Sequence, residues 1–298
     1  RLYRQSDVGS PTGDFHPISS CPCRAYQKIP GDAYGAPEFG VMRTIGESSV
    51  SQKWNSKKYS KDASFVSELG FPVVDLLAPK NGEIILDLGC GDGTLAKKLE
   101  SFGCEVIGVD FSESMVSSAK EKGIEAYCLS GEKLKFREHF DAVFSNAALH
   151  WMTDYDSVLN GVFSALKSNG RFIGEFGGIG NIKTITDAID YVFKSNPKLG
   201  CYQSPWFFPS DKQYQKILER NGFIVDSIEL IERPTPLVSG IREWLDIFAE
   251  HTTSSMSTSS KNEFLNQIEA LVKPKLYTKE NGWVADYVRL RFSAHKSA

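Results

Sequence analysis

The sequence predicts an α/β fold built on a doubly wound, mostly parallel sheet, and three observations predict it. Between residues 65 and 176, short aliphatic segments alternate with longer ones whose apolar residues recur every three or four positions. Glycines bound many of these segments. The chain of 298 residues is 41% hydrophobic and 12% aromatic, which is enough apolar mass to bury a sizeable core. Strands and helices that alternate in this way imply right-handed crossovers and helices on both faces of the sheet.

The expected strands are short and rich in aliphatic residues. Residues 84–88 form a mostly apolar run, which predicts a buried parallel strand. Residues 286–295 alternate apolar and polar side chains, as a strand with one wetter face does, and we expect them to return to the same sheet. Pro234 and Pro236 are expected to end the strand that begins at Phe223. In chain order, the seven expected strands cover residues 84–88, 106–109, 126–129, 141–144, 171–176, 223–231 and 286–295.

The expected helices follow the apolar periodicity and begin or end at capping residues. Thr94 begins a helix that ends near Gly103, and Ser112 is placed to cap the next one. Residues 65–77 are interrupted by a glycine and a proline, which predicts one broken helix or two short ones. The remaining helical patterns cover residues 158–166, 212–220, 241–251 and 262–272.

Residues 1–50 differ from the rest of the chain. They are rich in Gly, Pro and Ser and show no sustained periodicity. We expect a poorly ordered or non-native tail there, and a single domain over residues 51–298. Because the last strand is expected to return to the sheet, the helical patterns of residues 237–280 are interpreted as an insertion within that domain.

Composition and charge disfavour several classes of protein. The 34 basic and 37 acidic residues leave a net charge of −3, which disfavours a broad nucleic-acid surface. No apolar run approaches the roughly 20 residues that span a bilayer, so no membrane helix is expected. Of the six cysteines, only Cys21 and Cys23 are close together, and a lone C-x-C is a poor zinc signature. We therefore expect no metal, and a reducing, cytoplasmic location without a secretory leader.

A glycine-rich loop joins the first strand to the first helix of the core. Gly89, Gly91 and Gly93 follow Asp87 at G-x-G-x-G spacing, which lets the backbone approach a ligand closely. A Walker loop would need a lysine after its last glycine, and the dinucleotide fingerprint is G-x-G-x-x-G. The one-residue difference favours another cofactor.

From Ile84 to Thr94 the sequence resembles the first motif of the class I S-adenosylmethionine-dependent methyltransferases. From about Trp54 to Arg291 it is similar to their small-molecule branch, the methyltransferase type 11 and trans-aconitate methyltransferase-like proteins. The resemblance implies a Rossmann-like methyltransferase fold with S-adenosylmethionine as cofactor. It also implies that the glycine loop, including Cys90, contacts the methionine portion, and that Asp87 orders the loop and the cofactor amine.

Further cofactor contacts are expected at the ends of the next strands. Asp110 lies 21 residues beyond Gly89, where a carboxylate can accept hydrogen bonds from a ribose diol; the alternative is a helix cap. The family usually has Asp-Ala after the third strand, where this chain has Leu129-Ser130-Gly131-Glu132, so Ser130 is the expected adenine contact. The full set of expected cofactor-binding residues is Asp87, Gly89, Cys90, Gly91, Gly93, Asp110, Phe111, Ser130, Gly131, Glu132 and Asn146.

The acceptor is expected to bind beside the fourth strand, where strand order reverses. His150 is the candidate general base, with a purely structural hydrogen bond as the alternative. Trp151 is expected either as an aromatic wall near the sulfonium or as an ordinary core residue. Tyr59 matches a lid aromatic of relatives, and Trp206 belongs to the part that resembles the variable acceptor site. Four arginines are candidates to pair a substrate carboxylate, Arg242 among them: Arg233, Arg242, Arg289 and Arg291.

The resemblance also divides the domain and states a reaction. It implies lid helices over residues 51–80, a cofactor-binding core over 81–176 and a helical acceptor-site cap over 237–280. The expected reaction is methyl transfer to a small-molecule acceptor, with a carboxylate as one candidate, in a monomer or weak homodimer. Two alternatives remain: an NAD(P)-dependent reductase on a related fold, and a non-catalytic cofactor-binding regulatory protein. Nucleic-acid methylation is disfavoured, because the chain has no Asn/Asp-Pro-Pro-Tyr/Phe tetrapeptide.

Overall fold

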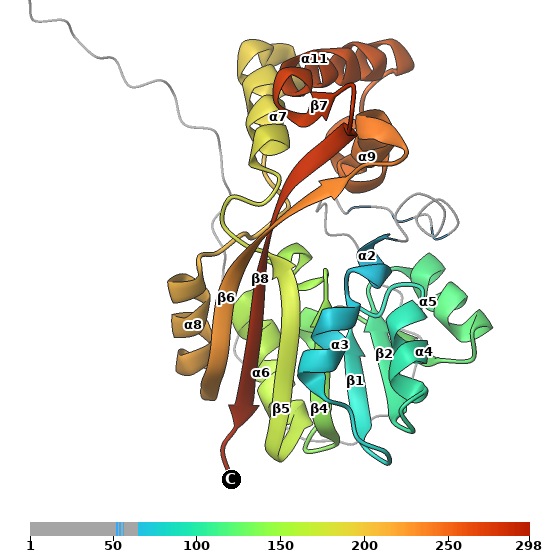
Figure 1. Ribbon diagram of the computed structural model, residues 1–298, viewed down its shortest axis with the longest axis vertical. Coiled ribbons are helices and arrows are strands. Elements are labelled where there is room, and N and C mark those ends of the chain that lie inside the picture. The colour runs from blue at the N-terminus through green and yellow to red at the C-terminus, as the bar shows by residue number, and fades with distance from the viewer. Residues whose placement is uncertain (1–51, 53, 55, 57–64) are drawn as a thin grey trace, which may run out of the picture. The chain divides into compact units, whose positions relative to one another are not determined.

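The computed structural model describes Gln52, Trp54, Ser56 and residues 65–298. In this part of the chain, the sheet has eight strands, one more than the seven expected, and seven of them lie in the order β3-β2-β1-β4-β5-β8-β6 (Figure 1). Strand β8 runs antiparallel to both of its neighbours, and the other adjacent pairs are parallel. The short strand β7 pairs with β8 outside this order. The doubly wound, mostly parallel sheet is therefore confirmed.

The elements of the described part alternate as expected up to β5. The strands are β1 Ile84–Leu88, β2 Glu105–Asp110, β3 Glu125–Cys128, β4 Phe140–Asn146, β5 Leu166–Gly177, β6 Phe223–Pro236, β7 Tyr277–Thr278 and β8 Gly282–Lys296. The α-helices are α2 Phe65–Glu68, α3 Phe71–Leu77, α4 Thr94–Glu100, α5 Glu113–Glu121, α6 Tyr155–Ala165, α7 Lys183–Ser195, α8 Asp211–Arg220, α9 Gly240–Phe248, α10 Glu250–Thr253 and α11 Thr258–Leu276. The 3₁₀ turns are η1 Gly131–Lys133, η2 Leu149–Trp151 and η3 Pro197–Leu199.

Two local expectations need correction. Strand β6 continues through Pro234 and Pro236 and pairs with β8 as far as Val284. The prolines fit because β6 lies at the edge of the sheet. The N–H of Leu237, directly after Pro236, points to β8 and donates to the Trp283 carbonyl, so positions 234 and 236 are the ones whose backbone nitrogens face away from β8. Helix α7 is not among the expected helices, although its buried residues recur at helical spacing. By contrast, Ser112 caps α5 as expected, accepting a hydrogen bond from the Met115 N–H.

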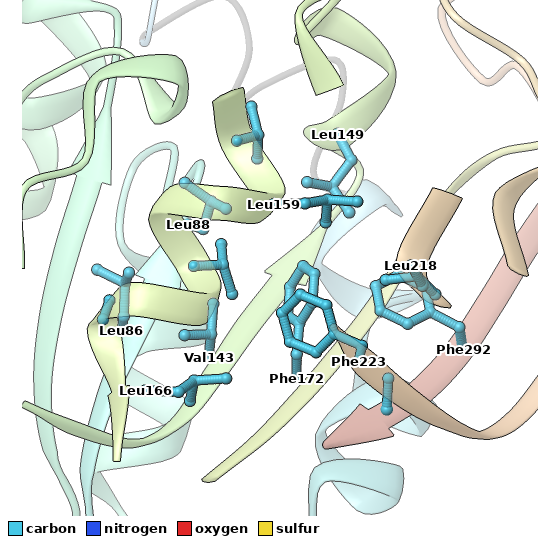
Figure 2. Packing of buried hydrophobic residues seen from close by; sticks show 14 of the residues in the cluster. Leu86, Leu88, Val143, Leu149, Leu159, Leu166, Phe172, Leu218, Phe223 and Phe292 are labelled. Atoms are coloured by element: carbon cyan, nitrogen blue, oxygen red, sulfur yellow. The ribbon is translucent and has the colours of Figure 1, made fainter. Parts of the chain in front are cut away.

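Two apolar clusters cover the two faces of the sheet. Leu86 and Leu88 of β1 face a cluster completed by α6, α8, β5 and β8, part of which is shown in Figure 2. Ile85, which directly precedes Leu86, faces a second cluster formed with α3, α4 and α5. Side chains from the two faces of this strand therefore enter opposite cores, which is why β1 has no solvent-exposed face. The glycine loop follows directly from this rigid strand.

A third cluster lies under helices α7, α9 and α11, away from the two sheet cores. Figure 1 shows these helices beyond the end of the sheet towards which the parallel strands run. Ile189 of α7, Trp244 of α9 and Ile268 of α11 are all buried there. The described residues include no helix long and apolar enough to cross a membrane. The helical part is thus placed at the strand ends, where open α/β sheets bind ligands.

Candidate active site

The three glycines of the loop after β1 all have positive φ, but they do different work. A Cβ added at Gly89 would lie 2.2 Å from the Ala148 Cβ, and one at Gly93 would lie 2.9 Å from the Ala119 Cβ. These two glycines let the loop pack against its neighbours. A Cβ at Gly91, where φ is +54°, would meet no atom within 4 Å. Gly91 is therefore the glycine that faces free space, as a ligand cradle requires.

Asp87 lies beside this loop as a buried carboxylate. Its side chain is 2% exposed, and Oδ2 receives no hydrogen bond from the described residues. Burial, reinforced by the nearby negative charges of Asp110 and Asp92, raises the pKa of Asp87 to about 8. A carboxylate so placed is costly unless a positive group joins it. The ammonium of a methionyl group is such a partner.

Asp110, at the end of β2, holds the loop in place. Its Oδ2 accepts the N–H of Gly91 at 3.0 Å, and its Oδ1 accepts the N–H of Ser112 at 2.8 Å. Burial raises its pKa, and the two backbone hydrogen bonds act in the opposite direction. Each oxygen keeps a second lone pair, so ordering the loop leaves capacity for ribose hydroxyls. The next residue, Phe111, is 57% exposed and offers a ring face at the same edge.

The residues after β3 mostly serve local structure. Ser130 Oγ accepts the N–H of Glu132 at 3.3 Å and caps η1. Glu132 Oε1 accepts the N–H of Asp154 at 3.1 Å, which ties η1 to the start of α6. A Cβ at Gly131 would lie 2.7 Å from the Met152 sulfur. This segment is near the expected adenine side, but its side chains already have structural partners.

Two other expected cofactor residues are partly or fully buried. Cys90 is buried, its Sγ lies 3.7 Å from the Gly91 carbonyl, and burial raises the pKa of its thiol. Asn146, at the end of β4, donates from Nδ2 to the Val66 carbonyl at 3.3 Å. Asn146 thus connects the core strand to α2. Tyr59, the expected lid aromatic, lies outside the described residues.

An aromatic cluster lies around Trp151, where the acceptor is expected. Its members, called the aromatic cluster below, are Trp54, Trp151, Trp206, Phe208 and Phe248. The ring centroids of Trp54 and Trp151 are 5.2 Å apart, and those of Trp151 and Trp206 are 5.6 Å apart. Trp206 and Phe208 stack at 5.9 Å. Trp151 and Trp206 were expected at the acceptor site, whereas Trp54 and Phe248 join them from segments with no local motif.

His150 contacts this cluster but has the hydrogen-bonding state of a donor. Its Nδ1 accepts the N–H of Gly177 at 3.4 Å, so the proton of the neutral ring lies on Nε2. Burial, and secondly the positive charge of Arg289, lower the pKa of His150 well below 6.5. The ring is therefore neutral and offers an N–H. This state does not suit the general-base role expected from the sequence, because the free lone pair is already used.

The four candidate arginines lie in different settings. Arg233 and Arg291 both bind Glu175, which is 2% exposed, at 2.5 Å and 2.7 Å. Arg289 is buried, over the ring of Tyr287 at 4.5 Å, and near enough to His150 to affect its pKa.

Arg242 does not join this group. Its Nε binds Glu269 Oε2 at 2.6 Å, and it also donates to Asn266, so it links α9 to α11. We therefore do not include Arg242, expected as a substrate contact, in the site proposed below.

Comparisons with known proteins show which family the chain resembles. The family model described as "Methyltransferase domain" matches residues 86–174. An uncharacterized methyltransferase of Schizosaccharomyces pombe is 36% identical over 266 residues, which cover 82% of this chain and 98% of the relative. A malonyl-[acyl-carrier protein] O-methyltransferase of Bacillus anthracis is 34% identical over 92 residues, 29% of this chain and 34% of the relative.

The fold has solved counterparts as well. The phosphoethanolamine N-methyltransferase 2 of Haemonchus contortus, solved in complex with S-adenosyl-L-methionine, superposes with a TM-score of 0.52 at 21% identity. The match covers 78% of this chain and 53% of that one. At this identity the likeness concerns the fold. The family model matches the core of this chain, and the Schizosaccharomyces pombe relative aligns over almost the whole of its own length. This chain therefore belongs to the class I methyltransferases whose cofactor is S-adenosylmethionine.

Proposed function

We propose that this protein transfers a methyl group from S-adenosylmethionine to a carboxylate oxygen of a small molecule. The observation that carries the proposal is the buried carboxyl group of Asp87, whose Oδ2 has no hydrogen-bond partner among the described residues, at the start of the loop in which Gly91 faces free space. In the proposed site Asp87 binds the cofactor ammonium, Gly91 gives the methionyl part close access, and Asp110 accepts the ribose hydroxyls. Phe111 supplies a ring face for the adenine. The residues present therefore fit the cofactor.

The cofactor, when bound, supplies a methyl group that its sulfonium has already activated. What the chain has to supply is alignment of the nucleophile and exclusion of water, which together can lower a barrier by roughly 7–11 kcal/mol. The aromatic cluster is suited to excluding water, and the strand ends hold the polar groups rigidly. The proposed cap over residues 237–280 and lid over residues 51–80 contribute Phe248 and Trp54 to this wall.

The charge around His150 supports an anionic acceptor. Arg233 and Arg291 both bind Glu175, so these three side chains together retain a net positive charge. Arg289 adds a third guanidinium on the same strand as Arg291. A carboxylate that accepts the N–H of His150 Nε2 would also be attracted by Arg289. A carboxylate nucleophile needs no general base, which agrees with a donor role for His150. The likeness to an O-methyltransferase supports oxygen as the methylated atom.

Two measurements test the proposal. Calorimetric titration with S-adenosylhomocysteine should show binding to the full chain and strong weakening in Asp87→Asn. Exchange of the exposed carboxylate in Asp75→Asn is the matched control and should leave binding unchanged. Incubation with S-adenosylmethionine carrying a tritiated methyl group and a panel of small carboxylic acids should yield methyl esters, which release volatile tritiated methanol in alkali. Alkali-stable products, or NADH binding without S-adenosylhomocysteine binding, would contradict the proposal.

A further inference from the structure

A second histidine near the aromatic cluster is oriented by Gln52. The carboxamide of Gln52 is 8% exposed; its Nε2 donates to the Ile247 carbonyl at 2.5 Å. Its Oε1 accepts the backbone N–H of His251 at 3.4 Å and lies 3.1 Å from His251 Nδ1. A carbonyl can only accept and a backbone N–H can only donate, so these two contacts determine which end of the amide is oxygen. His251 Nδ1 must therefore carry a proton.

The other ring nitrogen of His251 is then a bare acceptor. Burial lowers the pKa of His251 to about 4, so the ring is neutral at pH 7, and Nε2 carries a lone pair instead of a proton. Nε2 is buried and receives no hydrogen bond from the described residues. Leaving a buried acceptor unsatisfied costs about 1–3 kcal/mol. A ligand that supplies a donor would recover that free energy.

The two histidines border the same aromatic cluster in opposite tautomers. The ring of His251 meets Trp206 edge to face, with centroids 5.5 Å apart. His150 lies 5.4 Å from Trp151 and 5.7 Å from Phe208, and both of these rings contact Trp206. The cluster is thus flanked by one N–H donor, on His150, and one bare nitrogen acceptor, on His251. A small molecule that matches both histidines has a hydrogen-bond acceptor at one end and a hydrogen-bond donor at the other.

We propose that His150 and His251 select a hydroxylated carboxylic acid as the methyl acceptor: the carboxylate accepts the N–H of His150 Nε2, and the hydroxyl donates to His251 Nε2. Gln52 acts as a positioning residue, because it determines the tautomer of His251. The inference rests on the proposed function, in which the methylated group is a carboxylate. It adds a specificity: acids that lack the hydroxyl leave His251 Nε2 buried and unsatisfied.

The magnitude follows from that unsatisfied nitrogen. A loss of about 1–3 kcal/mol corresponds to a preference of about 5- to 150-fold for the hydroxy acid over its deoxy counterpart. In His251→Leu the preference should disappear, through slower methylation of the hydroxy acid and not through faster methylation of the other. His139→Leu is the matched control, since His139 is exposed and directly precedes β4, at the opposite end of that strand from Asn146.

The first experiment reads the tautomers without any turnover. Nitrogen-15 spectra of the full chain, labelled at histidine and saturated with S-adenosylhomocysteine, should show His251 protonated on Nδ1 and His150 protonated on Nε2. In Gln52→Leu the His251 tautomer should become mixed, while the His150 signals stay in place. Adding malate should shift the His251 Nε2 signal and adding succinate should not, with 4-hydroxyphenylacetate and phenylacetate as a second pair.

The second experiment compares kcat/KM for the same pairs of acids in the wild type and the two histidine variants. A hydroxy-acid preference that is lost in His251→Leu and kept in His139→Leu supports the proposal. It is overturned by a proton on His251 Nε2, by equal rates within each pair, or by a preference that survives in His251→Leu. If no acid is methylated, the proposed function fails instead, while the spectra still decide whether the tautomers are as inferred.

Discussion

Replacing Asp87 by asparagine should make the cofactor-free protein more stable and the stability difference should depend on pH. Burial raises the pKa of Asp87 from 3.8 to about 8. Between these values the folded chain keeps a proton that the unfolded chain releases, so the stability of the wild type falls as pH rises through this range. Below about pH 4 the carboxyl group is neutral in both states and costs nothing. Above about pH 8 the cost is constant.

The two pKa values set the size of the effect. They correspond to about 4 kcal/mol of lost stability at pH 7 and about 6 kcal/mol above pH 8, with a slope of about 1.4 kcal/mol per pH unit between. Asparagine resembles the protonated carboxyl group at every pH. Its own burial cost is independent of pH, so the change of the difference with pH isolates the ionisation of Asp87. Groups that do not interact with Asp87 titrate alike in both proteins and cancel, so the two neighbouring carboxylates, Asp110 and Asp92, are the other groups that can contribute to the difference.

Urea unfolding followed by tryptophan fluorescence at pH 5, 6, 7 and 8 measures this difference for the full chain. Asp75→Asn, which changes an exposed carboxylate on α3, should give no such trend. A stability difference between Asp87→Asn and wild type that stays level from pH 5 to pH 8 would refute the reasoning. The same variant should bind S-adenosylhomocysteine at least about 30-fold more weakly, because a buried charge pair loses one partner.

Three more predictions concern the same region. Binding of S-adenosylhomocysteine at pH 7 should release close to one proton from Asp87, because the ligand ammonium favours the charged form of this carboxyl group, whose pKa is about 8. Calorimetry in buffers of different ionisation enthalpy measures the number of protons released, which should fall to nearly zero by about pH 9. Gly91→Ala should cost only about 1–2 kcal/mol of stability but reduce cofactor affinity at least about tenfold. Gly93→Ala should instead destabilise the fold, because the added methyl group would contact Ala119. Thermal unfolding measures the stability of both variants, and titration measures their cofactor affinity. Glu175→Gln should lower unfolding free energy by about 3–5 kcal/mol, since Arg233 and Arg291 would lose their shared carboxylate; a change under about 1 kcal/mol in urea would contradict this.

The proposed cofactor half could be located from the sequence because its residues are neighbours in the chain. Asp87 and the loop glycines lie within seven positions, and Asp110 ends the next strand. Which of the three glycines pack against neighbouring residues, and which faces open space, could not be predicted. Gly93 is confined by Ala119, and Gly89 by Ala148, from segments some 26 to 59 positions away, and only the folded chain shows that Gly91 alone of the three has open space. The sequence likewise does not show that β6 continues through Pro234, because whether a strand lies at the edge or in the centre of the sheet depends on topology.

The acceptor half resisted prediction for a related reason. His150 could be found because it follows a core strand, but its role depends on the N–H of Gly177, which makes it a donor. His251 carries no motif, and its tautomer is determined by Gln52, 199 positions earlier. A sequence pattern identifies a histidine without showing which ring nitrogen holds the proton. The chemistry of a neutral histidine is decided by that proton.

The two halves of the site therefore differ in how they obtain specificity. The proposed cofactor half uses a buried carboxyl group whose ionisation costs stability until a positive ligand binds, so we expect binding to be coupled to proton release. The proposed acceptor half uses neutral rings whose polarity is held by backbone groups and one amide, so it distinguishes ligands by donor and acceptor position. Because His251 and Gln52 contact neither Asp87 nor the glycine loop through any described hydrogen bond, exchanging them should alter the choice of acceptor while S-adenosylhomocysteine affinity stays unchanged. A large loss of that affinity in His251→Leu would show that the two halves are not independent.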